Sequence, residues 1–274
     1  MRLTTFLVAL ATATLTAATR NLYIIAHQDD DLLFMNPSLL HAIHAGDTIQ
    51  TVYLTAGDSG LDAAYWSSRQ GGALAAYAQM AGVSNTWDEY DLGIEGKNIP
   101  KYTLRERDNI SLAFMHIPDG NGDGNGFAST GNESLEKLWQ GAIPYIRTVD
   151  DSGTTYSRGG LIASLAQAIN AFAPDAISSL DYIHAFGTGD HSDHTAGALF
   201  ANQAAILSTF PGDVKAYEGY PIKTLPANVV GKDLLEKKKA FYTYGPFDSA
   251  TCASDATCAG KEYEPWLLRE YKLN

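Results

Sequence analysis

Three things are scarce in this chain of 274 residues: basic side chains, cysteines and long hydrophobic runs. Lysine and arginine together number 19 against 31 acidic residues, so the formal net charge is -12 at pH 7. Nucleic acid and anionic membrane surfaces would repel such a chain, which argues against both as partners. No segment after the first twenty residues is long and apolar enough to cross a bilayer, so we expect no stable membrane insertion.

The first twenty residues differ in character from the rest. Arg2 precedes a run of apolar and small residues, 3–18, which ends in the letters LTAATR. A basic start, a short apolar stretch and small residues at its end are typical of a secretory signal peptide. We therefore predict a signal peptide over 1–19, cleaved near Ala18, and a secreted, extracellular protein. The alternative is that this run forms a buried first strand or helix.

The only two cysteines, Cys252 and Cys258, lie six residues apart in the polar segment TCASDATCAG. In an oxidising compartment, such a pair is most simply a disulfide that closes a small loop. The competing interpretation is half of a metal site. It lacks support because no histidine or further cysteine lies nearby in the sequence to complete the ligand set.

Strand-like and helix-like segments alternate along residues 20–274, and no linker or repeat divides them, so we predict one domain. β-α-β-α alternation predicts an α/β fold, Rossmann-like and three-layered, with a mostly parallel sheet and helices on both faces. The expected strands are 22–26, 48–57, 111–117, 175–181 and 214–220. The expected helices are 36–46, 67–82, 160–172 and 194–210. The segment LLEKKKAFYTY predicts a further helix whose three lysines form a solvated basic face.

A histidine and three aspartates follow the first predicted strand, in the stretch LYIIAHQDDD. Strand ends of this kind gather the functional sites of parallel sheets. Adjacent carboxylates such as Asp29, Asp30 and Asp31 repel one another unless a cation lies among them. The alternative is helix capping, which one aspartate would satisfy. Three aspartates together with His27 favour a metal site.

A second cluster, GTGDHSDHTAG, follows the predicted strand 175–181 and carries His191, Asp193 and His194. Two histidines and a carboxylate drawn from two strand ends can form a three-ligand zinc site that leaves a position for water. A further carboxylate could then take the proton of that water, and a spare imidazole could stabilise an oxyanion or protonate a leaving group.

These two motifs resemble those of a known family. AHQDDD is similar to the A-H-P-D-D-E motif of zinc-dependent de-N-acetylases related to GlcNAc-phosphatidylinositol deacetylase (PIG-L or LmbE-like proteins), and HSDH is similar to their H-P-D-H motif. The order and separation of the motifs agree as well, as do TAGDSG after the second strand and PDG at 118–120. The resemblance covers about residues 22–200.

The resemblance implies hydrolysis of the N-acetyl group of an amino sugar within a glycan or glycoconjugate. It implies three zinc ligands: His27, Asp30 and His194. Asp29 would be the general base, His191 an electrostatic or general-acid partner, and Asp193 would orient a histidine. Other divalent transition metals such as iron or cobalt could use the same ligands.

The sequence departs from the family pattern at several positions. Gln28 replaces the usual proline and Asp31 the usual glutamate. Gly189 stands where some members carry a tyrosine that donates to the oxyanion, so the donor in this chain is open. Arg69 follows TAGDSG, but Gly72 stands where a glutamate is common. Arg69 is therefore predicted either to contact substrate or to pair on a helix surface.

The segment PDGNGDGNG offers the first half of a calcium-loop pattern in Asp119, Asn121 and Asp123. The bidentate glutamate expected at its end is missing, and Thr130 stands there. A glycine-rich loop near the mouth of the active site is the alternative.

Two other functions compete with a deacetylase. A metal-dependent glycosyltransferase also uses acidic clusters after a strand, but the histidines favour zinc and export removes the chain from nucleotide sugars. A sugar-binding protein with an inactive site is the second alternative. It would have no need of Asp29 and His191 beside a metal.

Overall fold

The computed structural model describes residues 18–274, and the greater part of the predicted signal peptide lies outside them. Its centre is a seven-stranded sheet of order β3-β4-β5-β2-β1-β8-β9. Neighbours from β5 to β9 are parallel, whereas β4 is antiparallel to both β3 and β5. The strands are β1 (Arg20–Ile25), β2 (Thr48–Thr55), β3 (Trp87–Asp91), β4 (Pro100–Leu104), β5 (Arg107–Ile117), β8 (Ala176–Ser179) and β9 (Lys215–Ala216). A small separate sheet pairs β6 (Ile146–Arg147) with β7 (Thr155–Tyr156).

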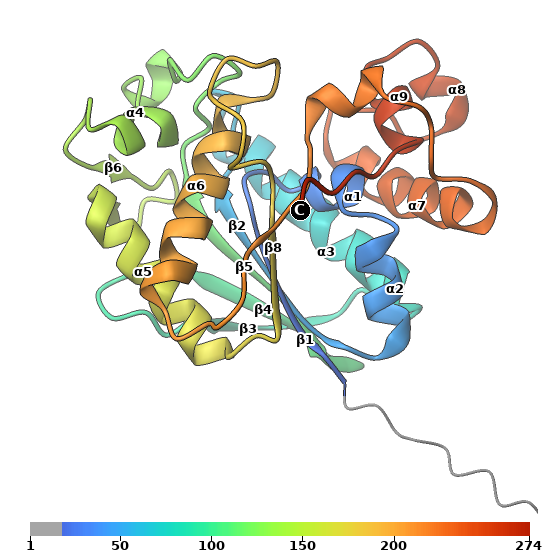
Figure 1. The fold of residues 1–274 in the computed structure, drawn as a ribbon, viewed down its shortest axis with the longest axis horizontal. Coiled ribbons are helices and arrows are strands. Elements are labelled where there is room, and N and C mark those ends of the chain that lie inside the picture. The colour runs from blue at the N-terminus through green and yellow to red at the C-terminus, as the bar shows by residue number, and fades with distance from the viewer. Residues whose placement is uncertain (1–17) are drawn as a thin grey trace, which may run out of the picture.

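Helices cover both faces of the sheet, as Figure 1 shows with α4, α5 and α6 on one side and α2, α3 and α7 on the other. The first layer contains α4 (Leu135–Gln140), α5 (Arg158–Phe172) and α6 (Ser192–Leu207). The second contains α1 (Asp30–Phe34), α2 (Ser38–Ala45), α3 (Ala63–Ala81) and α7 (Gly231–Tyr244), followed by α8 (Asp255–Cys258) and α9 (Tyr263–Leu267). Short 3₁₀ turns lie at Ala128–Thr130, Tyr220–Thr224 and Gly245–Phe247.

Side chains of the central strands alternate between the two helical layers. Leu22 and Ile24 of β1 pack in the core beneath α5 and α6, whereas Tyr23 and Ile25 pack beneath α2, α3 and α7. Both sets are buried, so the strand is apolar throughout, as expected for a parallel strand covered on two faces. The predicted α/β, Rossmann-like fold is therefore confirmed.

The predicted segments all contain elements of the expected kind, with two limits. The late strand is shorter than expected, since β9 spans only Lys215–Ala216 and Tyr220 begins a 3₁₀ turn. The antiparallel strands β3 and β4 were not predicted, because β3 is an edge strand without a buried residue and β4 buries only Leu104, so neither shows an apolar strand pattern.

The prediction of a fully solvated basic face on α7 is wrong at one residue. Lys237 is completely buried, and its ammonium donates hydrogen bonds to the carbonyl oxygens of Leu33, Trp266 and Arg269. Ala240, Phe241 and Tyr244 continue the same buried face at helical spacing. The face therefore belongs to the core and joins α7 to α1 and α9.

The C-terminal segment contains the predicted disulfide, which joins Cys252 to Cys258. Among the helices of residues 18–274, none has the length and hydrophobicity to cross a membrane.

Candidate active site

The site lies at the carboxyl ends of the parallel strands, where the chain leaves β1 and β8 in opposite directions across the sheet. β1 ends at Ile25, and the following turn carries His27 and Asp29 before α1 begins at Asp30. These three side chains are at most 7% exposed although all of them can ionise. Burial of so many polar groups is costly unless they are paired or bind a cation.

The three predicted metal ligands lie together. One ligand atom from each of His27, Asp30 and His194 falls within 4.8 Å of the others. Asp30 bridges the two rings, with Oδ1 3.0 Å from His194 Nε2 and Oδ2 3.4 Å from His27 Nδ1. Burial opposes protonation of His194, but Asp30 and Asp190 raise its pKa to about 10. The same negative field favours a metal cation beside these nitrogens.

Carboxylates lie behind the two histidines. Asp190 Oδ1 lies 2.7 Å from His194 Nδ1. A carboxylate with a lowered pKa only accepts, so Nδ1 carries a hydrogen, and Nε2 would offer its lone pair to a metal on losing its own proton. Asp193 Oδ2 lies 3.4 Å from His27 Nε2 and also accepts a hydrogen bond from the backbone N–H of Gly120. Asp193 thus lies where the resemblance places an orienting residue.

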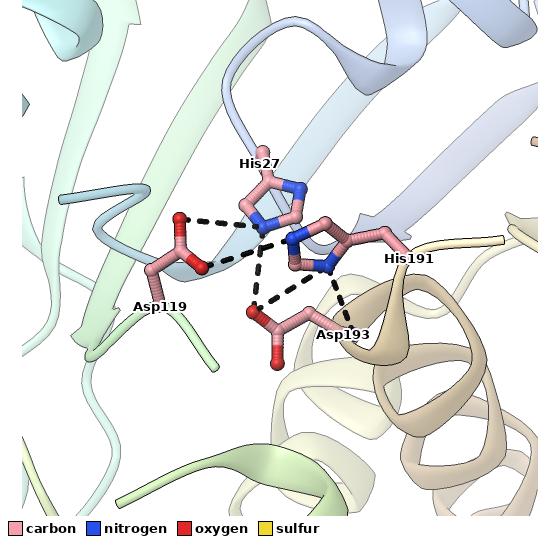
Figure 2. A group of neighbouring side chains, drawn as sticks. All are labelled: His27, Asp119, His191 and Asp193. Atoms are coloured by element: carbon pink, nitrogen blue, oxygen red, sulfur yellow. Dashed lines mark hydrogen bonds and ion pairs between the residues drawn. The ribbon is translucent and has the colours of Figure 1, made fainter. Parts of the chain in front are cut away.

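A second group of ligand-type side chains surrounds the other nitrogen of His27. Figure 2 shows His27, Asp119, His191 and Asp193 converging from three parts of the chain: the end of β1, the loop after β5 and the start of α6. His27 Nε2 is 4.0 Å from Asp119 Oδ2, and His191 Nε2 is 3.8 Å from Asp119 Oδ1. The group lies directly beside the three predicted ligands.

His191 caps α6 with its side chain. Its Nδ1 accepts the backbone N–H of Asp193 at 3.1 Å, so in the neutral ring the hydrogen is on Nε2, the nitrogen nearest Asp119. Burial lowers the pKa of His191 to about 4, and His27 and His194 act in the same direction. At neutral pH the ring is therefore an uncharged hydrogen-bond donor facing the cavity.

Asp29 is buried and paired with Arg69. Arg69 Nη2 lies 3.0 Å from Asp29 Oδ1, Nη1 donates to the carbonyl of Gly57, and Nε lies 2.9 Å from Asp248 Oδ2. Burial raises the pKa of Asp29 to about 6, although Arg69 opposes the rise. Arg69 is only 6% exposed, so pairing on an open helix surface is wrong; the guanidinium holds the side chain of Asp29 from within the core.

Gln28 and Asp31, the two residues of the first motif that differ from the family pattern, make hydrogen bonds behind the site. Gln28 Nε2 donates to the carbonyls of Thr55 and Ala56, which ties the turn to the end of β2. Asp31 Oδ2 accepts the hydroxyls of Tyr53 and Tyr77. Both side chains are fully buried and support the turn without facing the cavity.

Several residues of the site were missed at the level of sequence. Tyr220 lines the cavity, and its ring centroid lies 4.9 Å from that of His194. Its hydroxyl makes no hydrogen bond within residues 18–274, and burial raises its pKa well above the ordinary value. Asp248 and Trp266 reach the cavity from the C-terminal segment, where no motif marks them. Asp119 is the aspartate of the PDG motif, and Asp190 directly precedes the HSDH motif. Their positions in and beside these motifs could have marked both residues as part of the site.

The predicted calcium loop has divergent carboxylates. Asp119 is buried and faces His27 and His191, whereas the exposed Asp123 accepts hydrogen bonds from the backbone and side chain of Asn125. Asn121 Oδ1 accepts the N–H of Gly122. The loop thus contributes Asp119 to the site at the sheet, and calcium binding stays a prediction.

The sheet is mostly parallel, and a cluster of buried histidines and aspartates lies where the strand order reverses, between β1 and β8. These features define a Rossmann-like α/β protein whose clustered side chains are of the kinds that bind metals. A family model described as GlcNAc-PI de-N-acetylase (PIG-L) matches residues 22–205. The chain therefore belongs to the PIG-L family of deacetylases, which are hydrolases. No match was found among curated proteins.

Solved structures of similar fold include deacetylases and a hydratase. N,N'-diacetylchitobiose deacetylase from Pyrococcus horikoshii has a TM-score of 0.51 and 15% identity, over 91% of this chain and 76% of that one. The 4-carboxy-2-hydroxymuconate hydratase GalB from Pseudomonas putida has a TM-score of 0.49 and 14% identity, over 90% of this chain and 82% of that one. The zinc-inhibited form of teicoplanin deacetylase Orf2 has a TM-score of 0.45 and 17% identity, over 82% and 84%. At this identity, the likeness to the chitobiose deacetylase shows a common fold alone.

Proposed function

We propose that the protein is a secreted, zinc-dependent hydrolase that removes the N-acetyl group from an N-acetylated amino sugar of a GlcNAc- or GalNAc-type glycan or glycoconjugate. The observation that carries the proposal is the convergence of His27, Asp30 and His194 beside a buried Asp29, in a chain of the de-N-acetylase family. The products would be acetate and a free amine.

The donor set fits zinc. Two imidazole nitrogens and one carboxylate are the ligands of many catalytic zinc sites, and the buried His194 Nε2 lies 3.0 Å from Asp30 Oδ1 without forming a hydrogen bond to any of residues 18–274. When bound by His27, Asp30 and His194, zinc would polarise the acetyl carbonyl and lower the pKa of a water molecule. Other divalent transition metals could bind the same donors.

Asp29 is the proposed general base. It lines the cavity beside Asp30, and its raised pKa of about 6 leaves it ionised at neutral pH while keeping it a competent proton acceptor. Asp29 would take the proton of the attacking water and return it to the nitrogen of the departing amine. Arg69 would orient the carboxylate, and any contact of Arg69 with substrate would come through the cavity that it also lines.

The developing oxyanion has two proposed donors. His191 presents Nε2–H from the start of α6, and Tyr220 presents a hydroxyl that stays protonated because burial raises its pKa. Tyr220 would fill the role left open by Gly189, although it comes from a different segment of the chain.

Secretion is supported by the pattern of residues 1–19 and by the disulfide between Cys252 and Cys258. Expression with the native leader in a secreting host should release the protein into the medium with its N-terminus near Ala18. Retention in the cells with residues 1–19 intact would contradict this part of the proposal.

The central test combines metal content with acetate release. Purified protein should contain about one zinc per chain by mass spectrometry and release acetate from acetylated amino-sugar oligomers. Asp29→Asn should retain zinc and lose roughly 10³-fold in kcat. Asp213→Asn, which replaces an exposed carboxylate outside the cavity lining, serves as the matched control and should keep full activity. Protein that neither contains nor binds zinc, or full acetate release by Asp29→Asn, would refute the proposed mechanism.

A further inference from the structure

A second cavity lies beside the active-site cavity and is larger. The active-site cavity, lined by His27, Asp29 and Tyr220 among others, has a volume of about 110 Å³. The second has a volume of about 540 Å³. Small-molecule sites usually measure roughly 300–1,000 Å³, so the first cavity alone is small for a sugar and the second is of ordinary size.

The two cavities share their dividing wall. In three pairs of consecutive residues, one residue lines the active-site cavity and the other lines the second cavity. The pairs, with the active-site residue first, are Ser59 and Asp58, Tyr65 and Trp66, and Asp119 and Pro118. The wall is rigid, because Asp58 Oδ1 accepts the backbone N–H of Asp119 at 2.7 Å. A molecule that extends beyond the reacting acetamido group therefore finds the second cavity directly adjacent.

Trp66 provides an aromatic surface in the second cavity and is held in place from behind. Its ring packs against the imidazole of His116, with the centroids 4.6 Å apart. His116 is itself fixed between Gln70 and Asp150 at 2.8 and 3.2 Å. Apolar faces of pyranose rings pack on aromatic side chains held in this way.

Polar groups around Trp66 can bind sugar hydroxyls. The guanidinium of Arg147 uses Nη2 for Glu133, and its other nitrogens make no hydrogen bond within the described part of the chain. Thr148 and Ser129 add hydroxyl oxygens that can accept from a sugar, because their own hydrogens are donated to Asp150 and to the carbonyl of Gly60. Carboxylates outnumber Arg147 around the cavity, which disfavours sugars that carry carboxylate, sulfate or phosphate.

We propose that this cavity is a second sugar subsite, and that the substrate is a neutral or amino-bearing oligosaccharide whose adjoining residue packs on Trp66. The inference rests on the proposed deacetylase function and narrows its substrate class. A free amino monosaccharide would occupy only the smaller cavity and would gain nothing from Trp66.

The test compares chain lengths. Acetate release from N-acetylglucosamine and its β-1,4-linked trimer, and from the corresponding N-acetylgalactosamine compounds, gives a trimer-to-monomer ratio of kcat/KM. We expect a ratio of at least tenfold for the unaltered protein, reduced about tenfold in Trp66→Ala and largely restored in Trp66→Phe. Tyr90→Ala, an aromatic side chain 57% exposed on β3, is the matched control and should leave the ratio unchanged. If Trp66→Ala does not fold, Leu61→Ala and Arg147→Ala carry the test, because both side chains are more than half exposed.

Direct binding separates this inference from the proposed function. Trimer binding is measured by isothermal titration calorimetry in the unaltered protein and in Trp66→Phe and Trp66→Ala. Trimer binding that depends on residue 66, without acetate release, would support the subsite and refute the deacetylase. Acetate release with a ratio near one, or a ratio insensitive to Trp66→Ala, would refute the subsite and leave the deacetylase standing. Neither binding nor acetate release with any of the four compounds would refute both.

Discussion

Asp29 is balanced between two opposing effects at the scale of a single residue. Burial favours its neutral form, and the Arg69 guanidinium 3.0 Å away favours the carboxylate. Asp30, its neighbour in sequence, has the opposite outcome, because His194 and His27 hold its pKa well below the usual range despite burial. Two adjacent aspartates are thereby suited to different tasks, one to proton transfer and one to metal ligation.

The pH dependence of activity should report the pKa of Asp29. The base acts only when ionised, so kcat/KM should fall as pH drops through its pKa. Burial raises that pKa to about 6, and a bound cation can only lower it, so we expect the acid limb at or below about pH 6. Acetate release measured from pH 4 to pH 8 checks this. A limb near pH 7 would assign the base to another group.

Tyr220 should contribute to catalysis through its hydroxyl alone. Tyr220→Phe keeps the ring that stacks on Trp266 at 4.4 Å but removes the donor, so kcat should fall roughly 10²-fold with little change in thermal stability. Tyr263→Phe, which removes another cavity-lining hydroxyl, is the comparison and should have a much smaller effect. Equal losses in the two variants would argue against a specific donor role for Tyr220.

At the scale of elements, α9 and the loop that follows α7 close the site from outside the region that the family model matches. The match ends at residue 205, yet Asp248, Tyr263 and Trp266 line the cavity. Lys237 fastens this segment to α1 by donating to the carbonyls of Leu33, Trp266 and Arg269. Since α1 begins at Asp30, the same contact supports the turn that carries two of the proposed metal ligands.

Replacing Lys237 should destabilise this junction. Lys237→Met fills similar space but removes the ammonium donor from the carbonyls of Leu33, Trp266 and Arg269, although Trp266 keeps the backbone N–H of Arg269, so we expect the free energy of unfolding to fall by about 3 kcal/mol. Lys239→Met, on the exposed side of the same helix, should change it by less than about 0.5 kcal/mol. Urea unfolding of both variants measures the difference. Similar values for the two would place the Lys237 ammonium outside the stabilising contacts.

The elements also show how far sequence patterns reach. Long periodic segments such as α3 and α5, and apolar strands such as β1 and β2, were predictable because burial requires their spacing. The edge strand β3 and its neighbour β4 were not, since only one of their side chains, that of Leu104, is buried. The burial of Lys237 was not predicted, because three consecutive lysines are typical of a solvent-exposed helix face. Ala240, Phe241 and Tyr244 lie on the same face at helical spacing and are buried with it.

At the scale of the whole molecule, the proposed metal would join segments from opposite ends of the matched region. His27 and Asp30 follow β1, whereas His194 lies in α6. An ion that binds only the folded chain stabilises it by mass action, about 4 kcal/mol at a free concentration 1,000-fold above Kd. For a domain of this size, that corresponds to roughly 10 °C in Tm.

Removal of the metal should therefore be visible in thermal unfolding. Chelation is expected to lower Tm by roughly 10 °C and to abolish acetate release, with both restored by zinc. Asp30→Asn, which lacks one ligand, should show little response to chelator or zinc. An unchanged Tm in the unaltered protein after complete loss of zinc would contradict the proposed ligand set.

The sequence by itself determined the α/β alternation, the disulfide and the two motifs that meet at the switch point, because these depend on local spacing and on the fixed geometry of parallel strands. Only the tertiary structure decided that Asp193 reaches His27, that Arg69 turns inward to Asp29, and that Tyr220 and Trp266 close the cavity. Contacts of this kind join residues far apart in the chain, and no spacing rule links them. They arise only when packing brings separate elements to the same edge of the sheet.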